Sequence, residues 1–379
     1  MTNPFEYGTA VTGAAFCNRK KEIEDLRRSM DSAERLFVFS ERRMGKTSLI
    51  KTLCRILDPK KYLVVYVDLF PTESEESFAT TTAKALTTAL ESRTDRVLAV
   101  AKHLFSRLIP ALTLNEEGKP QLVFGASRTF EATESLEEVL RAPEKIAREI
   151  SRRVIVVFDE FQRIADYDVG QRVERLVRSV IQNQPAVGYI FLGSRKHLIR
   201  DMFTNESRPL YRSAGHYPLS AIDSSHWRPF IRDKFAQSGK EVSPKVVDAI
   251  CAYTEGHPSY TQQLCHAIWG IVEEGQAVTI EVVERGVQLL LQRESYAYSI
   301  LWESLTANQR RLLMALAQEK NSVGAFSSAF ATKYALGSLS SIQRSVKGLE
   351  ERDVIERDSK GYFIIDRFFK IWLHRQDPE

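Results

Sequence analysis

A stretch with the residue types of a phosphate-binding loop lies near the N-terminus, between an apolar run and a helical pattern. Gly45, Lys46 and Thr47 form its core. In such a loop backbone N–H groups and the positive end of the following helix surround the phosphates, an ammonium meets the terminal phosphates and a hydroxyl binds Mg²⁺. The pattern predicts a site for a nucleoside triphosphate, lined by Arg42, Arg43, Met44, Gly45, Lys46, Thr47 and Ser48.

The first position of this loop departs from the usual pattern. Ser40 stands where glycine is usual, five residues before Gly45. Serine can form the strand-to-loop turn if the φ angle required is negative. We therefore expect a working loop, although Ser40 makes tight nucleotide binding less assured. The alternative is a chance strand-loop-helix with a solvated Lys46.

A pair of carboxylates supplies the complement that a phosphate loop needs. Asp159 and Glu160 follow the apolar run 154–158. Asp159 would hold Mg²⁺ and Glu160 would polarise the attacking water. The alternative is a strand that ends in a solvated acidic turn, and the upstream loop favours the catalytic interpretation.

Polar residues after another apolar run, 187–192, form a third pattern. Ser194 and Arg195 follow this run. The planar fork of an arginine suits a γ-phosphate, so Arg195 is a candidate sensor of the triphosphate. The alternative is a surface arginine in a strand-to-helix loop.

Two further segments supply candidate nucleotide contacts. His257 and Pro258 open a helix, where His257 would lie near the positive end and could reach a β-phosphate. Phe16 could pack against a base, and Arg19 could brace the nucleotide or a neighbouring acid. Taken alone, each of these segments also reads as an ordinary helix start.

Apolar runs separated by helical patterns predict the elements that position these residues. The expected strands are 36–39, 62–69, 154–158, 187–192 and a weaker one at 217–221. Such alternation is typical of an α/β fold with a doubly wound parallel sheet, whose ligands lie at the carboxyl ends of the strands. Ser40, Asp159 and Ser194 all fall at that edge. Residues 92–135 fit no core strand and indicate an insertion, either a solvated helical excursion or a partner-binding face.

The C-terminal half has a different pattern. Residues 224–299 read as helical, with turn signals between the helices. Helical segments at 307–318, 326–334 and 338–352, followed by a hairpin over 354–365, have the order of a winged helix. The predicted domains are therefore an ATPase core at 1–222, a helical lid at 223–300 and a winged helix at 301–379.

Composition excludes several classes of protein. The chain has 379 residues, a formal charge of +4 and four scattered cysteines without a CxxC pair. A chain of this length can bury a full core. Its slight basicity permits nucleic-acid contact without arguing for it. The spacing of the cysteines predicts neither a zinc site nor a disulfide framework. No apolar run is long enough to span a bilayer, and a soluble cytoplasmic protein is expected.

The order of these motifs resembles the archaeal and bacterial ATPase family of the STAND group, signal-transducing relatives of AAA+ proteins that include the origin-recognition-like ATPases. The resemblance runs from Asn3-Pro4-Phe5 through the phosphate loop, Asp159-Glu160-Phe161-Gln162 and Gly256-His257-Pro258 to Trp372-Leu373. It implies a P-loop additional-strand sheet with a helical lid and a C-terminal winged helix, which binds ATP or ADP. By this resemblance Lys46 and Thr47 contact phosphate and Mg²⁺, Asp159 and Glu160 are the metal-site and catalytic acids, and Arg195 is the γ-phosphate sensor. Asn18 departs from the family pattern, which usually has glycine before Arg19.

Three functions remain open. The first is an ATP-driven switch that hydrolyses slowly and rearranges the winged helix or assembles subunits. In that case Arg208 and Arg212 could act at a neighbouring subunit's site or form structural ion pairs. The second is a DNA-binding ATPase that resembles replication-initiator or transposition-helper proteins and reads DNA with Ser338, Ser340, Gln343, Arg344 and Lys347. The third is a scaffold that holds ADP without hydrolysing ATP.

Overall fold

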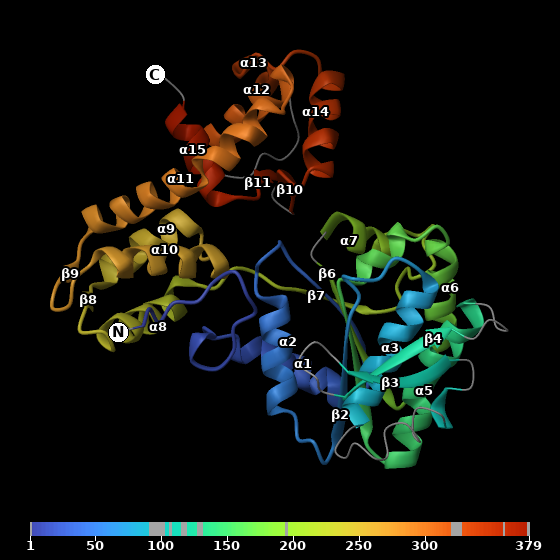
Figure 1. The fold of residues 1–379 in the computed structure, drawn as a ribbon. Coiled ribbons are helices and arrows are strands. Elements are labelled where there is room, and N and C mark those ends of the chain that lie inside the picture. The colour runs from blue at the N-terminus through green and yellow to red at the C-terminus, as the bar shows by residue number, and fades with distance from the viewer. Residues whose placement is uncertain are drawn as a thin grey trace. The chain divides into compact units, whose positions relative to one another are not determined.

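The computed structural model describes residues 2–90, 103–105, 108–114, 120–126, 132–193, 196–319, 328–358 and 361–376. The chain forms two compact units. The sheet unit is Arg19–Ser220, and the helical unit combines Met1–Asn18 with Ala221–Glu379. Figure 1 shows the elements of both units along the chain.

The centre of the sheet unit is a five-stranded parallel sheet. Its strand order is β2-β5-β6-β1-β7. The bounds are β1 (Arg35–Phe39), β2 (Tyr62–Asp68), β5 (Arg153–Asp159), β6 (Val187–Gly193) and β7 (Gly215–Pro218). Every residue of β6 is buried, as expected for a parallel strand with helices on both faces, and this is why its sequence is continuously apolar. β6 lies between β1 and β5, so the strand that carries the phosphate loop does not touch the strand that carries the carboxylates.

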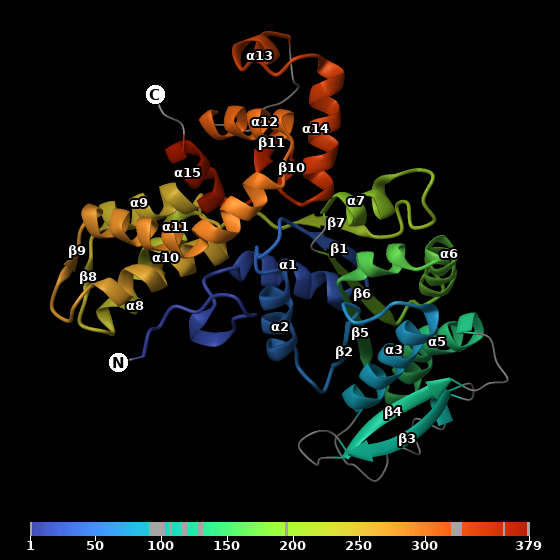
Figure 2. The ribbon, with the colours of Figure 1, turned by 45° about the horizontal axis from the view of Figure 1, so that its top comes forward.

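Helices cover both faces of this sheet. α1 and α2 lie on one side, and α3, α5 and α6 lie on the other (Figures 1 and 2). A cluster of phenylalanines, including Phe37, Phe158 and Phe191, fills the interior. The helices and short 3-10 turns of this unit are α1 (Lys20–Asp31), α2 (Lys46–Ile56), α3 (Glu75–Leu90), α5 (Ala132–Ile150), η2 (Phe161–Asp166), α6 (Gly170–Ile181) and α7 (Lys196–Thr204).

The predicted insertion contains a hairpin. β3 (Leu108–Leu114) and β4 (Pro120–Ala126) pair antiparallel and form a separate two-stranded sheet. The expectation of a helical excursion did not anticipate these strands. The remainder of 92–131 lies outside the described residues, apart from 103–105.

The helical unit begins with a bundle of four helices. They are α8 (Ser224–Ala236), α9 (Pro244–Thr254), α10 (Pro258–Ile271) and α11 (Ile280–Glu303), joined by the short parallel strands β8 (Glu241–Val242) and β9 (Ala277–Val278). The N-terminal segment, with the 3-10 turn η1 (Gly13–Ala15), packs on this bundle. The Phe5 ring lies 5.0 Å from that of Phe235, and Gln262 donates to the Ala15 carbonyl over 2.9 Å. Residues 1–18 therefore group with the bundle, whereas the predicted division placed them in the core. The division into domains at 1–222, 223–300 and 301–379 remains a prediction.

The C-terminal elements of the helical unit have the order expected of a winged helix. They are α12 (Ala307–Gln318), α13 (Ser328–Lys333), α14 (Leu339–Glu351), the antiparallel pair β10 (Ile355–Arg357) and β11 (Tyr362–Ile364), and α15 (Arg367–Gln376). Thr306 begins α12 with a capping box. Arg367, which is 8% exposed, donates to Glu255 of the bundle over 3.0 Å, and the Tyr298 hydroxyl donates to Asp366. These contacts join the winged helix to the bundle.

The structure also describes the state of the cysteines and the length and polarity of the helices. No disulfide joins any of the four cysteines, all of which lie in described parts of the chain. Within the ranges that the structure describes, every helix is too short or too polar to cross a bilayer.

Candidate functional site

The predicted phosphate loop lies between the end of β1 and the start of α2. Gly45 is the N-cap of α2 and has a φ of 87°. This left-handed backbone is one that glycine adopts without strain, so the loop needs glycine at this position. The loop therefore turns directly into the positive end of an eleven-residue helix, which is the geometry that favours an anion.

Ser40 supplies the loop with a contact that glycine could not make. Its φ angle is not positive, so serine makes this turn without the left-handed backbone that favours glycine. The Lys46 ammonium donates to the Ser40 hydroxyl over 3.0 Å, to the Ser40 carbonyl over 3.2 Å and to the Glu41 carbonyl over 2.9 Å. A phosphate that binds Lys46 competes with these acceptors.

Ser40→Gly is expected to tighten ATP binding about three- to tenfold, because one charge-assisted hydrogen bond to Lys46 is lost from the empty loop. Calorimetric titration with ATP and Mg²⁺ measures the change. Ser40→Ala, which removes the hydroxyl without adding backbone freedom, should give most of the same gain. Unchanged or weaker binding by both variants would show that the hydroxyl does not compete for Lys46.

The two predicted metal ligands lie together. Asp159 ends β5 and is 7% exposed, and the Thr47 hydroxyl of α2 donates to its Oδ2 over 3.1 Å. The backbone N–H of Glu160 donates to its Oδ1 over 2.9 Å. A hydroxyl and a carboxylate are oxygen donors of the kind that Mg²⁺ prefers, and Mg²⁺ takes its other ligands from phosphates and water. The side chains present therefore fit the predicted ion.

Glu160 is held by a residue that the sequence analysis assigned no role of its own. Its backbone is left-handed, with a φ of 53°, and the Gln162 amide donates to its carboxylate. A Cβ atom at Gly193 would lie 2.5 Å from the Gln162 Oε1, so the glycine that ends β6 leaves room for this glutamine. Gln162 is 4% exposed, and its signal in the sequence was its place two positions after Glu160 in the segment that carries the family resemblance.

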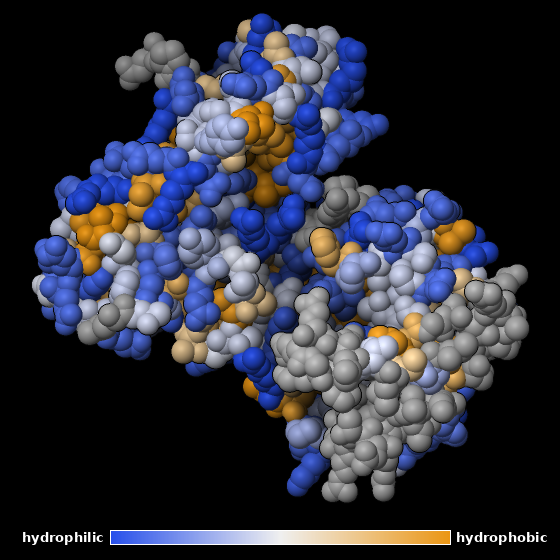
Figure 3. All heavy atoms as spheres, in the orientation of Figure 1, coloured by the Kyte–Doolittle hydropathy of each residue, from blue (hydrophilic) through white to orange (hydrophobic). Residues whose placement is uncertain are grey.

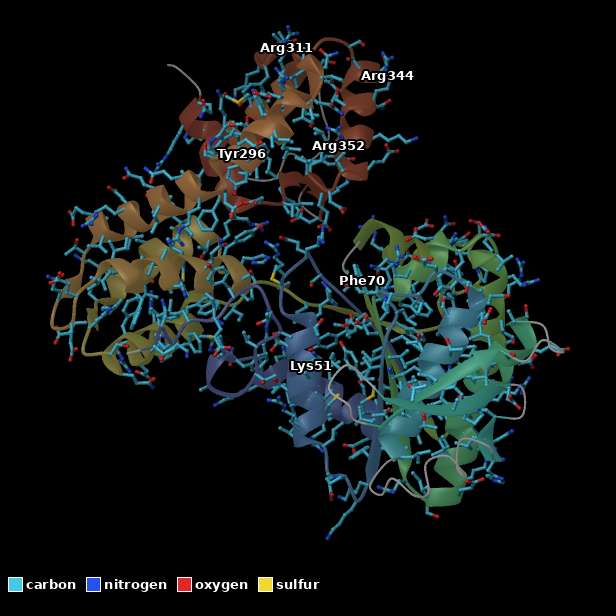
Figure 4. All side chains as sticks on the ribbon, in the orientation of Figure 1. Lys51, Phe70, Tyr296, Arg311, Arg344 and Arg352 are labelled. Atoms are coloured by element: carbon cyan, nitrogen blue, oxygen red, sulfur yellow. The ribbon has the colours of Figure 1, made fainter. Side chains whose placement is uncertain are left out.

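Tyr66 is a second residue that the sequence analysis did not single out. It lies on β2, and its hydroxyl donates to the Oδ2 atom of Asp159. The ammonium of Lys51 lies 5.8 Å from the centre of the Tyr66 ring. Figure 4 shows Lys51 on α2. Burial and the neighbouring Asp159 carboxylate raise the pKa of Tyr66, so the phenol remains a donor. Only the pairing of β2 with β5 reveals this contact.

Arg19 lies beside the phosphate loop and pairs with an acid. Its side chain is 4% exposed, contacts Glu22 at 2.7 Å and donates to the Met44 carbonyl over 3.4 Å. Of the two predicted contacts, the structure places the neighbouring acid beside Arg19. Asn18 before it has a φ of 53°, and asparagine tolerates this conformation better than most residues, which explains how it replaces the usual glycine.

The other predicted contacts belong to the helical unit or fall outside the described residues. Ser194 and Arg195 fall outside the described residues. Phe16, His257 and Pro258 belong to the helical unit. Pro258 begins α10, and the ring of its N-cap residue His257 lies 4.5 Å from the Tyr260 ring. Their roles towards a nucleotide stay predictions.

Arg208 forms the structural ion pair that was the alternative to a role at a neighbouring subunit. It contacts Glu174, which is fully buried, and lies 3.6 Å from Asp201. Burial raises the pKa of Glu174 to about 7, while Arg208 opposes the rise. Arg212 is exposed, and its guanidinium lies 5.1 Å from the centre of the Tyr211 ring.

Arg208→Ala is expected to destabilise the sheet unit by about 3 kcal/mol, because Glu174 would be buried without its cation. Urea unfolding measures the change. Arg212→Ala is the matched control and should stay within about 0.5 kcal/mol of wild type. Equal, small effects of the two substitutions would contradict a structural role for Arg208.

Comparisons with known proteins identify the family and the fold of this chain. Residues 16–264 match the family model described as an ATPase domain predominantly from Archaea, and residues 296–375 match a probable winged helix domain. A Walker-type ATPase of Pyrococcus abyssi superimposes with a TM-score of 0.64 at 19% identity, covering 95% of this chain and 96% of that one. The ORC2 protein of Aeropyrum pernix, described as ADPNP–ADP complexes, superimposes with a TM-score of 0.52 at 12% identity, covering 94% of both chains. No curated protein sequence matches the chain. The predicted α/β fold with a P-loop sheet and a C-terminal winged helix is confirmed.

Proposed function

Since this chain belongs to the family of ATPase domains found predominantly in Archaea, we propose that it binds ATP and ADP with Mg²⁺ and hydrolyses ATP. One observation carries the proposal. The Thr47 hydroxyl, next to Lys46 at the start of α2, donates to Asp159 at the end of β5, a strand that is not a neighbour of β1 in the sheet. A phosphate ligand and a metal ligand from α2 thereby meet a carboxylate from a distant part of the sequence.

Each proposed role follows from the chemistry of the side chain. Gly45, Ser48 and the backbone of Arg42, Arg43 and Met44 would surround the phosphates, while Lys46 would exchange its loop acceptors for phosphate oxygens. Thr47 and Asp159 would hold Mg²⁺, which supplies charge neutralisation to the phosphates when bound. Glu160 would orient and polarise the attacking water. The proposal also includes Arg195 and Ser194 as γ-phosphate contacts and Phe16, Arg19, His257 and Pro258 as further nucleotide contacts.

The finer proposal is a molecular switch of the STAND type that hydrolyses slowly or with a partner's help. The Gln162 amide donates to one oxygen of the Glu160 carboxylate, and this contact would orient the acid towards the attacking water. A nucleotide can shift the arrangement of the lid and winged helix, or the assembly of subunits, only if it binds one conformational state more tightly than the other. Each tenfold difference in affinity changes the free-energy difference between the two states by about 1.4 kcal/mol.

The proposed ATPase is tested by measuring phosphate release from purified wild type with ATP and Mg²⁺, beside mass spectrometry of any nucleotide that copurifies. We expect slow release and adenine nucleotide in the purified protein. Release that is independent of Lys46 would show that the activity comes from another site or another protein.

A DNA-binding ATPase is the second candidate, because one face of α14 is exposed and polar. Ser340, Gln343, Arg344 and Lys347 are exposed on this face, and hydrophilic residues cover this helix in Figure 3. Ser338 instead caps the helix, accepting from the N–H of Ser341 over 3.3 Å. Residues 306–379 carry twelve lysines and arginines against nine aspartates and glutamates, which is a small surplus for a protein that reads a groove.

Filter binding to duplex DNA at two salt concentrations separates the candidates. If α14 reads DNA, the slope of log K against log salt should fall by about one for each phosphate-contacting cation removed, as in Arg344→Ala and Lys347→Ala. The switch predicts that binding at physiological salt is weak and that neither substitution changes it. A steep salt slope that both substitutions reduce would favour the DNA-binding ATPase.

A further inference from the structure

The Tyr66 hydroxyl suggests a further role in the proposed site. We propose that Tyr66 is a positioning residue that fixes the metal-site carboxylate of Asp159. The proposal rests on the proposed function, because it concerns how the same site prepares for Mg²⁺.

Strand pairing brings Tyr66 to this position. Tyr66 pairs with Val157 in the register of β2 and β5, two residues before Asp68 pairs with Asp159. Residues alternate along β2, so that Val64 and Tyr66 share the half-buried face while Val65 and Val67 are buried. A tyrosine is long enough to reach from this face to the carboxylate that ends the neighbouring strand.

The three donors to Asp159 differ in what metal binding would require of them. Thr47 and Tyr66 both donate to Oδ2, and the Glu160 N–H donates to Oδ1. Thr47 is itself a proposed metal ligand, whose oxygen would bind the ion through a lone pair while its hydrogen donates to Asp159. Tyr66 and the Glu160 N–H have no such second task and hold one carboxylate oxygen each. The plane of the carboxylate would therefore be fixed by two donors that do not themselves bind the ion.

Loss of such an orienting contact should change the affinity of the site for Mg²⁺ by a measurable factor. Partners that hydrogen-bond to a metal ligand typically contribute about 10- to 100-fold to metal affinity or activity. Tyr66→Phe removes only the hydroxyl and keeps the ring beneath Lys51. We expect the Mg²⁺ concentration for half-maximal ATP binding to rise about tenfold, with ATP binding in EDTA unchanged and kcat largely restored at saturating Mg²⁺.

The experiment titrates Mg²⁺ at fixed ATP by calorimetry and follows Mn²⁺ binding to the ADP complex by electron paramagnetic resonance, which needs no turnover. Tyr189→Phe is the matched control. Its hydroxyl donates to Gln184 from a buried position on β6. Tyr189 pairs with Val156 whereas Tyr66 pairs with Val157, so the two tyrosines lie on opposite faces of the sheet. Tyr189→Phe should leave the Mg²⁺ requirement unchanged.

The outcomes separate this proposal from the one on which it rests. Equal Mg²⁺ requirements of Tyr66→Phe and wild type, or equal shifts in Tyr66→Phe and Tyr189→Phe, would overturn the positioning role while ATP binding still stood. Failure of wild type to bind ATP at any Mg²⁺ concentration would overturn the proposed function, and this proposal with it.

Discussion

Lys46→Ala is expected to weaken ATP binding at least about 100-fold, which is about 2.7 kcal/mol. Lys46 is 7% exposed, and its ammonium donates to Ser40 and Glu41 within its own loop. A bound phosphate would take over these hydrogen bonds with a stronger, doubly charged interaction. Alanine is also a good helix former, so α2 should persist. Calorimetry with ATP and Mg²⁺ measures the loss directly.

Thermal unfolding provides the second readout for this variant. A ligand that binds only the folded state stabilises it by RT ln(1 + [L]/Kd), which is about 2.7 kcal/mol at one hundred times Kd. Wild type should therefore melt at a higher temperature in ATP, and Lys46→Ala should not. Lys84→Ala, which alters an exposed lysine of α3, is the control and should respond as wild type does. A full response to ATP by Lys46→Ala would contradict the assigned loop.

Glu160→Gln is expected to leave ATP binding within about threefold of wild type and to lower turnover at least about 100-fold. Glutamine has nearly the same shape as glutamate but cannot accept the proton of the attacking water. The left-handed backbone at residue 160 and the nearby Gln162 amide set its position, and neither depends on charge alone. Malachite-green detection of phosphate at saturating ATP measures turnover.

Glu137→Gln is the control for this substitution. Glu137 forms a surface pair with Arg141 on α5 at 2.7 Å, and such pairs contribute little to stability. Its turnover should equal that of wild type. Equal phosphate release by wild type, Lys46→Ala and Glu160→Gln would show that the assigned site is wrong. No release by wild type, with ADP bound, would favour the non-hydrolysing scaffold.

The central strands β5 and β6 could be predicted because nearly all of their residues are buried. β5 and β6 have helices on both faces, so their sequences are continuously apolar and end at polar residues. The hairpin β3-β4 was missed because its proline and glycine residues read as loop signals and its two strands lie outside that sheet. The packing of residues 1–18 on the helical bundle could not be read from the sequence. The contact of Phe5 with Phe235 joins residues far apart in the chain, and no local pattern marks it.

The site could be predicted only where one residue type implies one chemistry. Lys46, Thr47 and Asp159 belong to motifs whose spacing is local. The contacts of Tyr66 with Asp159 and of Arg208 with Glu174 depend on which elements are neighbours in space. A tyrosine in a strand and an arginine in a loop have many ordinary uses, so neither signals its partner.

Calorimetric titration of the purified protein with ATP and ADP in the presence of Mg²⁺ tests the central claim most directly. We expect one saturable site for adenine nucleotide on wild type and none on Lys46→Ala. The absence of binding heat for both nucleotides at two temperatures, or identical titrations of wild type and Lys46→Ala, would contradict the account.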